Sequence, residues 1–482
     1  MSAPKAIAGL SGPSFGPATL PGGTGSPGGG GALFGTPVAS PKGLSIAWDD
    51  PAFAENPAWT WIDDPSGSYH VQGFTIDRGR GYEFDRTTTG TARVRLYDTS
   101  GAFDPTNATG PFYGKLDPLK QAALAIYNPA ATTWSTVFRG FISDWSYLMH
   151  QTEKYIGVEL LLVDALDTLA AVELVPGGTF GDTVPAGSEG DIFYAQDRNT
   201  NAVQTRINKV LNEVGWAAGL RSIFTGNVKL GGSETEDGTV YPNRTAALSV
   251  IQDAADAEFP GVANTYVSKD GKVTFHGRLA RFNPTDTQYQ IDTWLCGDNA
   301  AHLAAPTTTA PIVPPLQFAR DKEHLYTSAI ATPNGVADGD IAAQFVTDAA
   351  AKAKYGTRTW SAENLLTGGG AGGTTALVET KKFATYYVEN YKAPQTRVAQ
   401  LSFHAAHTTG ARATIEWPLV CGIDIGDRVL LTTTHSGGGG FNTYYFVEGL
   451  HYTVAPFNGT HASVELTIDV SPAAHYTTNP FV

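Results

Sequence analysis

Apolar and polar positions alternate in short runs through the first part of the chain. Period-two alternation between turn residues is typical of β-strands. It predicts strands at 44–48, 69–76, 92–97, 122–127, 136–142 and 154–163, and a short helical turn follows at 163–169. We therefore expect residues 45–175 to form a first β module.

The pattern changes to a helical period in residues 176–315. Ile207, Val210, Leu211 and Val214 recur at the spacing of one helix face, and a similar run occupies 245–258. Asp270-Gly271 stands between the apolar runs 263–267 and 273–276, which predicts a β-hairpin. This range is predicted to be an α+β module.

Strand patterns return in 316–336 and 396–482, where we expect a second β module related to the first. The intervening range 337–395 is predicted to be a helical insertion, with helices at 340–355 and 378–391 and a glycine linker at 368–373. The run 437–440 reads as a hairpin tip. The predicted fold class is mainly β with α+β insertions.

Residues 1–44 are rich in glycine and proline, and Lys5 and Lys42 are their only charged residues. Such a composition cannot build a core. Two interpretations stay open: a disordered tail, or an extended arm that becomes ordered against a neighbouring subunit.

Composition narrows the class of protein. The chain has 482 residues with 54 glycines, 29 prolines and 16% charged residues, which favours β structure and turns. Its net charge of −14 disfavours sequence-independent binding to nucleic acid.

The two cysteines, Cys296 and Cys421, are expected to be unpaired thiols rather than a disulfide. No signal peptide or membrane anchor is predicted, so we expect a soluble protein made in a cytosol.

Candidate chemistry is weak in this sequence. His404, His407, His451 and His461 lack the H-E-x-x-H spacing of a zinc protease, and no phosphate-binding loop or G-x-S-x-G elbow occurs. Asp98 opens a segment that superficially resembles a calcium loop but lacks the closing glutamate, so a turn bonded by the Asp98 side chain is expected instead. We predict no enzyme activity, no catalytic residue, no metal and no cofactor.

A set of short motifs nevertheless occurs in a recognisable order over roughly residues 65–450. The set comprises Arg78-Gly79-Arg80, Gly90-Thr91-Ala92, Phe103-Asp104-Pro105, Phe138-Arg139-Gly140, Val163-Asp164 and Gly426-Asp427-Arg428. In this order the motifs resemble minor tail proteins of long-tailed phages, especially those of actinobacterial hosts.

The resemblance implies a tail-tip, or baseplate, hub protein located in the virion and synthesised in the host bacterial cytoplasm. Hubs of this kind carry two tube-type β-barrel modules per chain and assemble as homotrimers, so that six modules match a sixfold tail tube. The implied partners are distal-tail and tail-tube proteins, the tape-measure protein and other minor tail proteins, while phage DNA passes without specific binding. Two alternatives stay open: a hexameric distal-tail ring protein, and a tip protein that binds host-wall carbohydrate through residues such as Trp59 or Trp134.

Under the hub interpretation, several residues are candidates for a subunit interface. They are Arg78, Arg80, Arg86, Phe103, Arg139, Asp427 and Arg428. Arg139 is an isolated cation in an apolar strand and is expected to pair with a carboxylate, for example that of Asp144. Gly90 is expected to lie where its strand passes close to another backbone, so that Gly90→Val would block assembly more than solubility.

Overall fold

The structure is a computed structural model. It describes residues 42–62, 67–150, 155–175, 192–195, 202–231, 238–298, 309–320, 322–370, 374–434, 439–457 and 461–481. Most of the Gly/Pro-rich arm (1–41), the linker residues 371–373 and the first half of the glycine run at 437–440 lie outside these ranges.

The first β module is an antiparallel sheet in the order β3-β4-β7-β6-β5-β1, with β2 (Thr60–Trp61) on the far edge of β1. All six predicted strands are present, and most are longer than their patterns indicated. They are β1 (Lys42–Ala47), β3 (Tyr69–Gly79), β4 (Thr88–Asp98), β5 (Gln121–Asn128), β6 (Thr133–His150) and β7 (Tyr155–Val163). The short helix α1 (Ala165–Ala171) follows, and Asp164 caps it by accepting a hydrogen bond from the Leu166 N–H.

The second β module is built around the hairpin of β24 (Gly440–Phe457) and β25 (His461–Pro472). β22 (Gln400–Ala405) pairs with β25, and β23 (Arg428–Thr434) pairs with β24. β14 (Thr293–Gly297), which comes from the predicted α+β range, lies parallel to β23, and β15 (Ala310–Pro311) adds to β14. The helix α9 (Gly410–Gly422) was not predicted: 396–482 was read as β, but Ala413, Trp417 and Val420 bury one helix face.

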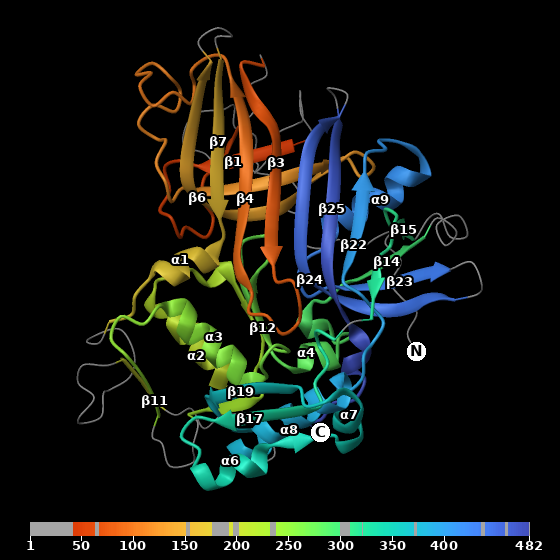
Figure 1. Cartoon of the computed structure of the whole chain (residues 1–482). Coiled ribbons are helices and arrows are strands. Elements are labelled where there is room, and N and C mark those ends of the chain that lie inside the picture. Colours follow the sequence, from red (N-terminus) through yellow and green to blue (C-terminus); the bar gives the residue numbers. More distant parts are fainter. Residues whose placement is uncertain are drawn as a thin grey trace.

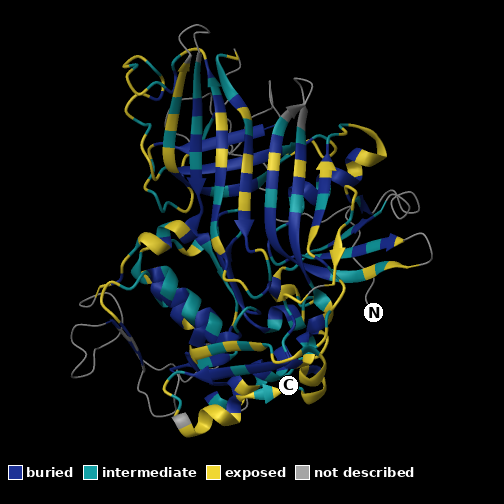
Figure 2. Ribbon diagram, viewed as in Figure 1, coloured by how far each residue is buried: buried dark blue, intermediate teal, exposed yellow. Residues whose placement is uncertain are grey.

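The two modules form one sheet, because β24 of the second pairs with β3 of the first. Figure 1 shows β4, β3, β24 and β25 side by side in the upper half of the molecule. Buried and exposed positions alternate along these strands, so that one face is covered and the other is open (Figure 2). On the covered face, a single hydrophobic core includes Val94 and Leu124 of the first module and Val429 and Leu466 of the second. The prediction of a mainly β fold with α+β insertions is confirmed.

The α-containing parts lie together in the lower half of the molecule (Figure 1). The predicted helices at 205–214 and 245–258 are α2 (Ala202–Glu213) and α3 (Ala247–Glu258), and the predicted hairpin is β12 (Asn264–Val267) with β13 (Val273–His276). The remaining short elements of this part are α4 (Leu279–Phe282), β8 (Ile192–Ala195), β9 (Arg221–Ile223), β10 (Val228–Leu230) and β11 (Gly238–Tyr241).

The predicted helical insertion differs from its pattern in two places. The range 340–355 is two helices, α6 (Asp338–Gln344) and α7 (Ala349–Tyr355), because the chain between them forms β18 (Val346–Thr347) against β17 (Ser328–Pro333). The start of the glycine linker is a strand, β20 (Thr367–Gly370), which pairs with β10. The predicted helix at 378–391 is α8 (Ala376–Tyr391).

The range 316–336, which was assigned to the second β module, is placed outside the large sheet. β17 pairs with β18 and with β19 (Thr359–Leu365) in a separate sheet that packs on α8, and β16 (Phe318–Ala319) pairs with β21 (Arg397–Val398). The helical insertion therefore packs against part of the range that precedes it, and the division of the chain into domains stays a proposal.

Candidate functional site at the junction of the two modules

The junction between the modules is the antiparallel pair β24–β3, which runs from Val454 opposite Phe74 to Gly449 opposite Gly79. At its lower end only glycine fits. Gly79 has φ +96°, and a Cβ there would lie 2.2 Å from the Glu448 carbonyl oxygen; a Cβ on Gly449 would lie 2.8 Å from the Arg80 carbonyl oxygen. The motif Arg78-Gly79-Arg80 therefore marks the closest approach of the two modules.

Arg80 forms a buried ion-pair cluster with Glu448 at this end of the junction. Its Nε lies 2.8 Å from Glu448 Oε2, and Arg281 donates to both oxygens of Glu448 at 2.6 and 2.8 Å. Burial by itself would raise the pKa of Glu448, but the Arg281 and Arg80 guanidiniums outweigh it and lower the pKa to about 2. Arg281 also lies 3.8 Å from Glu83, which accepts hydrogen bonds from the Tyr391 and Tyr476 hydroxyls.

Arg78 points the other way and contacts the hairpin of β12 and β13. It donates to Asp424 Oδ1 at 2.9 Å and to the Val267 carbonyl at 3.1 Å. The hairpin turn reaches the same carboxylate, because the Lys269 N–H donates to Asp424 Oδ2 at 2.8 Å. The Lys269 ammonium donates to the carbonyls of Cys421 and Gly422 at the C-terminal end of α9, where a cation is favoured. The hairpin thus links β3 of the first module to α9 and its following turn in the second.

Arg428 is the first residue of β23, and Asp427 directly precedes it. Asp427 is 6% exposed and accepts from the Trp294 indole at 3.0 Å and from the Asp424 N–H at 2.9 Å; burial raises its pKa to about 7. The Arg428 guanidinium lies 4.8 Å from the centre of the Tyr444 ring and donates to Thr293 Oγ1 at 3.1 Å.

The other predicted interface residues lie away from this junction. Phe103 is fully buried beside Tyr69 and Phe112, and the Asp98 side chain bonds the Phe103 and Ser100 N–H groups, as the expected turn requires. Arg86 is half exposed and forms ion pairs with Asp253 and Asp256.

Arg139 does not pair with Asp144. It donates to the Gln121 side chain at 2.8 Å and to the Glu55 carbonyl at 3.2 Å, with its guanidinium 5.2 Å from the Trp59 ring centre. Burial lowers the pKa of Arg139 to about 10. A neutral amide and a carbonyl accept its hydrogen bonds, while the charge of Asp270, and not that of Asp144, partly offsets the lowering of its pKa.

Taken together, the structure brings Arg78, Arg80 and Asp427 to the junction and buries them there, each 6% exposed or less. Their side chains make contacts within the chain. Arg86 and Arg428 keep more exposure, and their contact with a neighbouring subunit stays a prediction.

Gly90 is also packed closely, but against a side chain. A Cβ on Gly90 would lie 2.6 Å from Asp164 Oδ2, the oxygen that accepts from the Gly90 N–H at 2.8 Å. The close backbone expected from the sequence is also present, because the Asp164 N–H donates to the Gly90 carbonyl at 2.9 Å; the nearest obstacle to a Cβ is the carboxylate that caps α1.

Solved structures to which this chain is similar are tail and secretion-spike proteins. The tail protein from Neisseria meningitidis MC58 is 10% identical, with 90% of this chain and 98% of that chain covered and a TM-score of 0.48. The 43 kDa tail protein of prophage MuSo2 from Shewanella oneidensis is 10% identical, with 90% and 99% covered and a TM-score of 0.46.

The E. coli c3393 protein is described as a type VI secretion component with structural similarity to the T4 bacteriophage tail proteins gp27 and gp5. It is 10% identical, with 84% of this chain and 74% of that chain covered and a TM-score of 0.41. No family model and no curated protein sequence matches the chain. Similarities this distant do not assign a function, which has to be argued from the residues of the chain itself.

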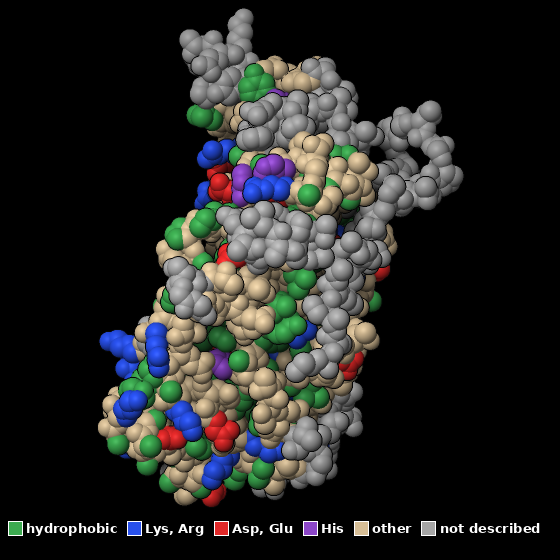
Figure 3. All heavy atoms as spheres, turned by 90° about the vertical axis from the view of Figure 1, so that its right-hand side faces the viewer, with side chains coloured by type: hydrophobic (Ala, Val, Ile, Leu, Met, Phe, Trp, Pro, Cys, Tyr) green, Lys and Arg blue, Asp and Glu red, His purple; other side chains and the backbone are tan. Residues whose placement is uncertain are grey.

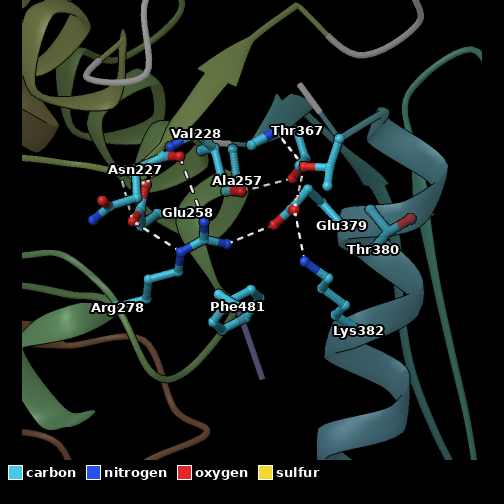
Figure 4. A network of polar contacts seen from close by, with 12 residues as sticks. Asn227, Val228, Ala257, Glu258, Arg278, Thr367, Glu379, Thr380, Lys382 and Phe481 are labelled. Carbon is cyan, nitrogen blue, oxygen red and sulfur yellow. Dashed lines mark hydrogen bonds and ion pairs between the residues drawn. The ribbon is translucent and has the colours of Figure 1, made fainter. Parts of the chain in front are cut away.

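A second buried network, which the sequence did not indicate, joins the two α-containing parts (Figure 4). Arg278 bonds Glu379 of α8 at 2.7 Å and lies 3.6 Å from Glu258 at the end of α3. Glu258 accepts from the Asn227 and Val228 N–H groups, and Lys382 adds a second cation beside Glu379. The Phe481 ring lies 3.8 Å from the Arg278 guanidinium. Glu258 and Glu379 are 0% and 1% exposed, and the apolar periodicity of α3 and α8 carries no signal that these carboxylates are buried.

Three of the four histidines considered for metal binding are engaged in separate contacts, and the side chain of His461 lies outside the described part of the chain. His404 bonds Ser463, His407 bonds Glu416, and His451 bonds Asp77 and Asp469. Histidine side chains gather near the upper end of the face drawn in Figure 3. Within the described ranges, no group of three His, Cys, Asp or Glu side chains is placed to hold a metal ion.

Two further features bear on the class of protein. Cys296 and Cys421 are both buried free thiols, and burial raises the pKa of each. In the part of the chain that the structure describes, no helix is long and apolar enough to cross a membrane.

Proposed function

We propose that this chain is a structural virion protein of a phage tail tip, a hub ring that joins the tail tube to the distal tip. The observation that carries the proposal is the continuous sheet. Two β modules from opposite ends of the chain share backbone hydrogen bonds through β24 and β3, and one face of the joined sheet is open across both.

A ring wall needs such a surface. An antiparallel sheet can hold a core on one face and meet water on the other. The open face carries Thr75 and Asp77 on β3, Thr453 on β24 and Glu465 on β25, so it is polar from one module to the next. On β4 the same face carries Arg93 and Arg95, which share the carboxylate of Glu159. A mainly polar lining suits the passage of DNA without specific binding.

The proposed number of chains in the ring is inferred from the presence of two β modules in each chain. Three chains with two modules each present six similar sheet segments to a sixfold tube, and head-to-tail contacts between their sheet edges would close the ring. The proposed assembly is therefore a homotrimer with no enzymatic role. Distal-tail, tail-tube, tape-measure and minor tail proteins are its proposed partners.

The α-containing half supports the assignment to a hub over a simple tube ring. It lies on one side of the β modules (Figure 1) and is held to them by the buried pair of Arg281 on α4 with Glu448 on β24. A ring protein that only extends a tube needs one module and no such half. The half is proposed to contact the proteins of the distal tip.

A cryo-EM reconstruction of the tail tip of a virion that contains this chain tests the proposal. We expect three copies around an open channel, with the face of β3, β4, β24 and β25 toward the channel. Six copies per ring would replace the hub with the hexameric distal-tail alternative. A single copy, or a solid centre, would contradict both.

Mass photometry of the purified protein gives an independent test. Assembly in solution would appear as a species of three times the 50.9 kDa chain mass. A species of six times that mass would favour the distal-tail ring.

A further inference from the structure

A hollow of about 640 Å³ lies on the open face of the sheet, where β24 parts from β3 beside the start of β1. The pairing of β24 with β3 ends at Val454 and Phe74. Small residues of the two strands line the hollow at this point, namely Gly73, Thr75, Thr453 and Ala455. His70, Gln72 and other larger residues of the same strands also line the hollow.

Charged residues line the hollow on the side of β4. Arg93 and Arg95 have side chains that are 67% and 75% exposed, and both share the carboxylate of Glu159, at 3.2 and 3.8 Å. Lys42 is 5% exposed, also lines the hollow and donates its ammonium to the Gln72 carbonyl at 2.8 Å. Two exposed guanidiniums, those of Arg93 and Arg95, therefore share one carboxylate in this lining, on a chain whose net charge is −14.

We propose that this hollow binds an extended acidic peptide segment of a partner protein, with carboxylates at alternate residues. Arg93 and Arg95 are two residues apart on one face of β4, so they are separated by about 6.6 Å along the strand. An extended peptide has the same rise per residue, so side chains at alternate positions match that separation. Guanidinium groups bind carboxylates through strong, often bidentate hydrogen bonds.

Two other occupants fit less well. Nucleic acid binding rests on neutralising many phosphates, and a pair of exposed arginines on an acidic chain supplies little of that. Residues 1–41 of this chain join β1 next to the hollow, but Lys5 is their only charged side chain and they contain no aspartate or glutamate. The charge of the site favours a segment from another protein.

Fluorescence anisotropy with the full-length chain and a labelled peptide tests the site. The peptide is Gly-Thr-Glu-Thr-Glu-Thr-Glu-Thr-Gly at low ionic strength, and the matched peptide has glutamine in place of each glutamate. We expect saturable binding of the acidic peptide, and a loss of at least about 10-fold in affinity in Arg93→Gln/Arg95→Gln, because two charge-assisted contacts are removed. Arg244→Gln, which removes another exposed arginine paired to Glu173, is expected to leave binding unchanged.

Glu159→Gln separates binding from folding. Glu159 competes with the ligand for both arginines, so its removal is expected to strengthen peptide binding by about 3-fold or more. Damage to the fold cannot produce that gain. Equal binding of the glutamine peptide, tighter binding of oligodeoxythymidine, or no gain in Glu159→Gln would overturn the proposal. The peptide site does not depend on ring assembly. A result that overturns it would leave the hub proposal unaffected, and the number of copies per ring would still test that proposal.

Discussion

The imidazole of His451 on β24 bonds Asp77 on β3, with 2.9 Å between Nδ1 and Asp77 Oδ1. Its other nitrogen lies 2.7 Å from Asp469 Oδ2 on β25. Gln400 of β22 donates to the second oxygen of Asp469 at 2.8 Å. A polar row therefore crosses four strands at the point where the two β modules meet.

Stability is expected to fall at alkaline pH because of this row. The hydrogen bond that His451 donates to the Asp469 carboxylate, together with the one to Asp77, raises the pKa of His451 to about 9. A histidine whose pKa is raised on folding contributes its full stabilisation at pH values below its pKa in the unfolded chain, which is about 6.5. The contribution is lost as the pH rises through about 9.

The check is the melting temperature between pH 6 and pH 10 in wild type and in His451→Gln. The variant should lack the alkaline decline, and the difference should stay near 1 kcal/mol or less, because partly exposed ion pairs contribute little. His404→Gln, which removes an exposed histidine bonded to Ser463, serves as the control. Parallel pH profiles for wild type and His451→Gln would refute the assignment.

Replacing Glu448 with glutamine is expected to destabilise the chain severely. Arg80 and Arg281 would lose their shared carboxylate while staying buried, and breaking a buried pair in this way costs about 3–5 kcal/mol. Urea unfolding measures the change. Glu173→Gln, in an exposed pair with Arg244, should cost less than about 1 kcal/mol.

The lowered pKa of Glu448 also predicts how the stability of the fold changes at acid pH. Because its pKa is lowered to about 2, its contribution is present above about pH 4.5 and is lost as the pH falls toward 2. Acid unfolding followed by tryptophan fluorescence should therefore lose part of its pH dependence in Glu448→Gln. An unchanged acid transition would show that the cluster does not hold the junction.

A methyl group at Gly79 is expected to open the junction of the modules. Gly79→Ala would place its Cβ 2.2 Å from the Glu448 carbonyl oxygen and would also strain a φ of +96°. Gly114 has a similar φ of +72° with open space around it, so Gly114→Ala reports the strain alone, about 1 kcal/mol. We expect Gly79→Ala to cost clearly more, and hydrogen exchange of β3 and β24 to rise. Equal costs in the two variants would contradict a close approach.

Gly90→Val is now expected to impair folding more than assembly. The added side chain would displace the Asp164 carboxylate, which caps α1 and accepts from the Gly90 N–H. Loss of a cap and of a buried acceptor costs about 1–3 kcal/mol. Soluble yield and melting temperature are the readouts. Gly81→Val, where the nearest neighbour of a Cβ is 3.9 Å away, is the control, and a fully stable Gly90→Val that fails only to assemble would restore the first expectation.

Local signals in the sequence were sufficient for the strands and the main helices. Period-two alternation located β3, β4 and β7, and Asp270-Gly271 located the turn between β12 and β13, because these features depend on residues that are close in the chain. The α9 helix was not predicted from the sequence because it carries glycine at its start and Pro418 inside, and because it lies between strands. Packing of Trp417 and Leu419 against the sheet outweighs its weak local preference.

The junction could be predicted only in part. The motif Arg78-Gly79-Arg80 was recognised as a feature of interest and was assigned to contacts with a neighbouring subunit. In the structure Arg80 meets Glu448, which is 368 residues away in the chain, and Arg78 meets Asp424, which is 346 residues away. No local pattern tells an arginine at a subunit surface from one that is paired inside the chain.

The sequence by itself therefore determined the mainly β class, the alternation of each strand and the hairpin turns, since these follow from backbone preferences and from which face of an element is apolar. Only the tertiary structure decided that the two β modules share one sheet, that the junction is closed by buried ion pairs, and that Arg93 and Arg95 face a hollow. These features depend on contacts between distant residues, and the energy of a buried charge depends on the partner that reaches it.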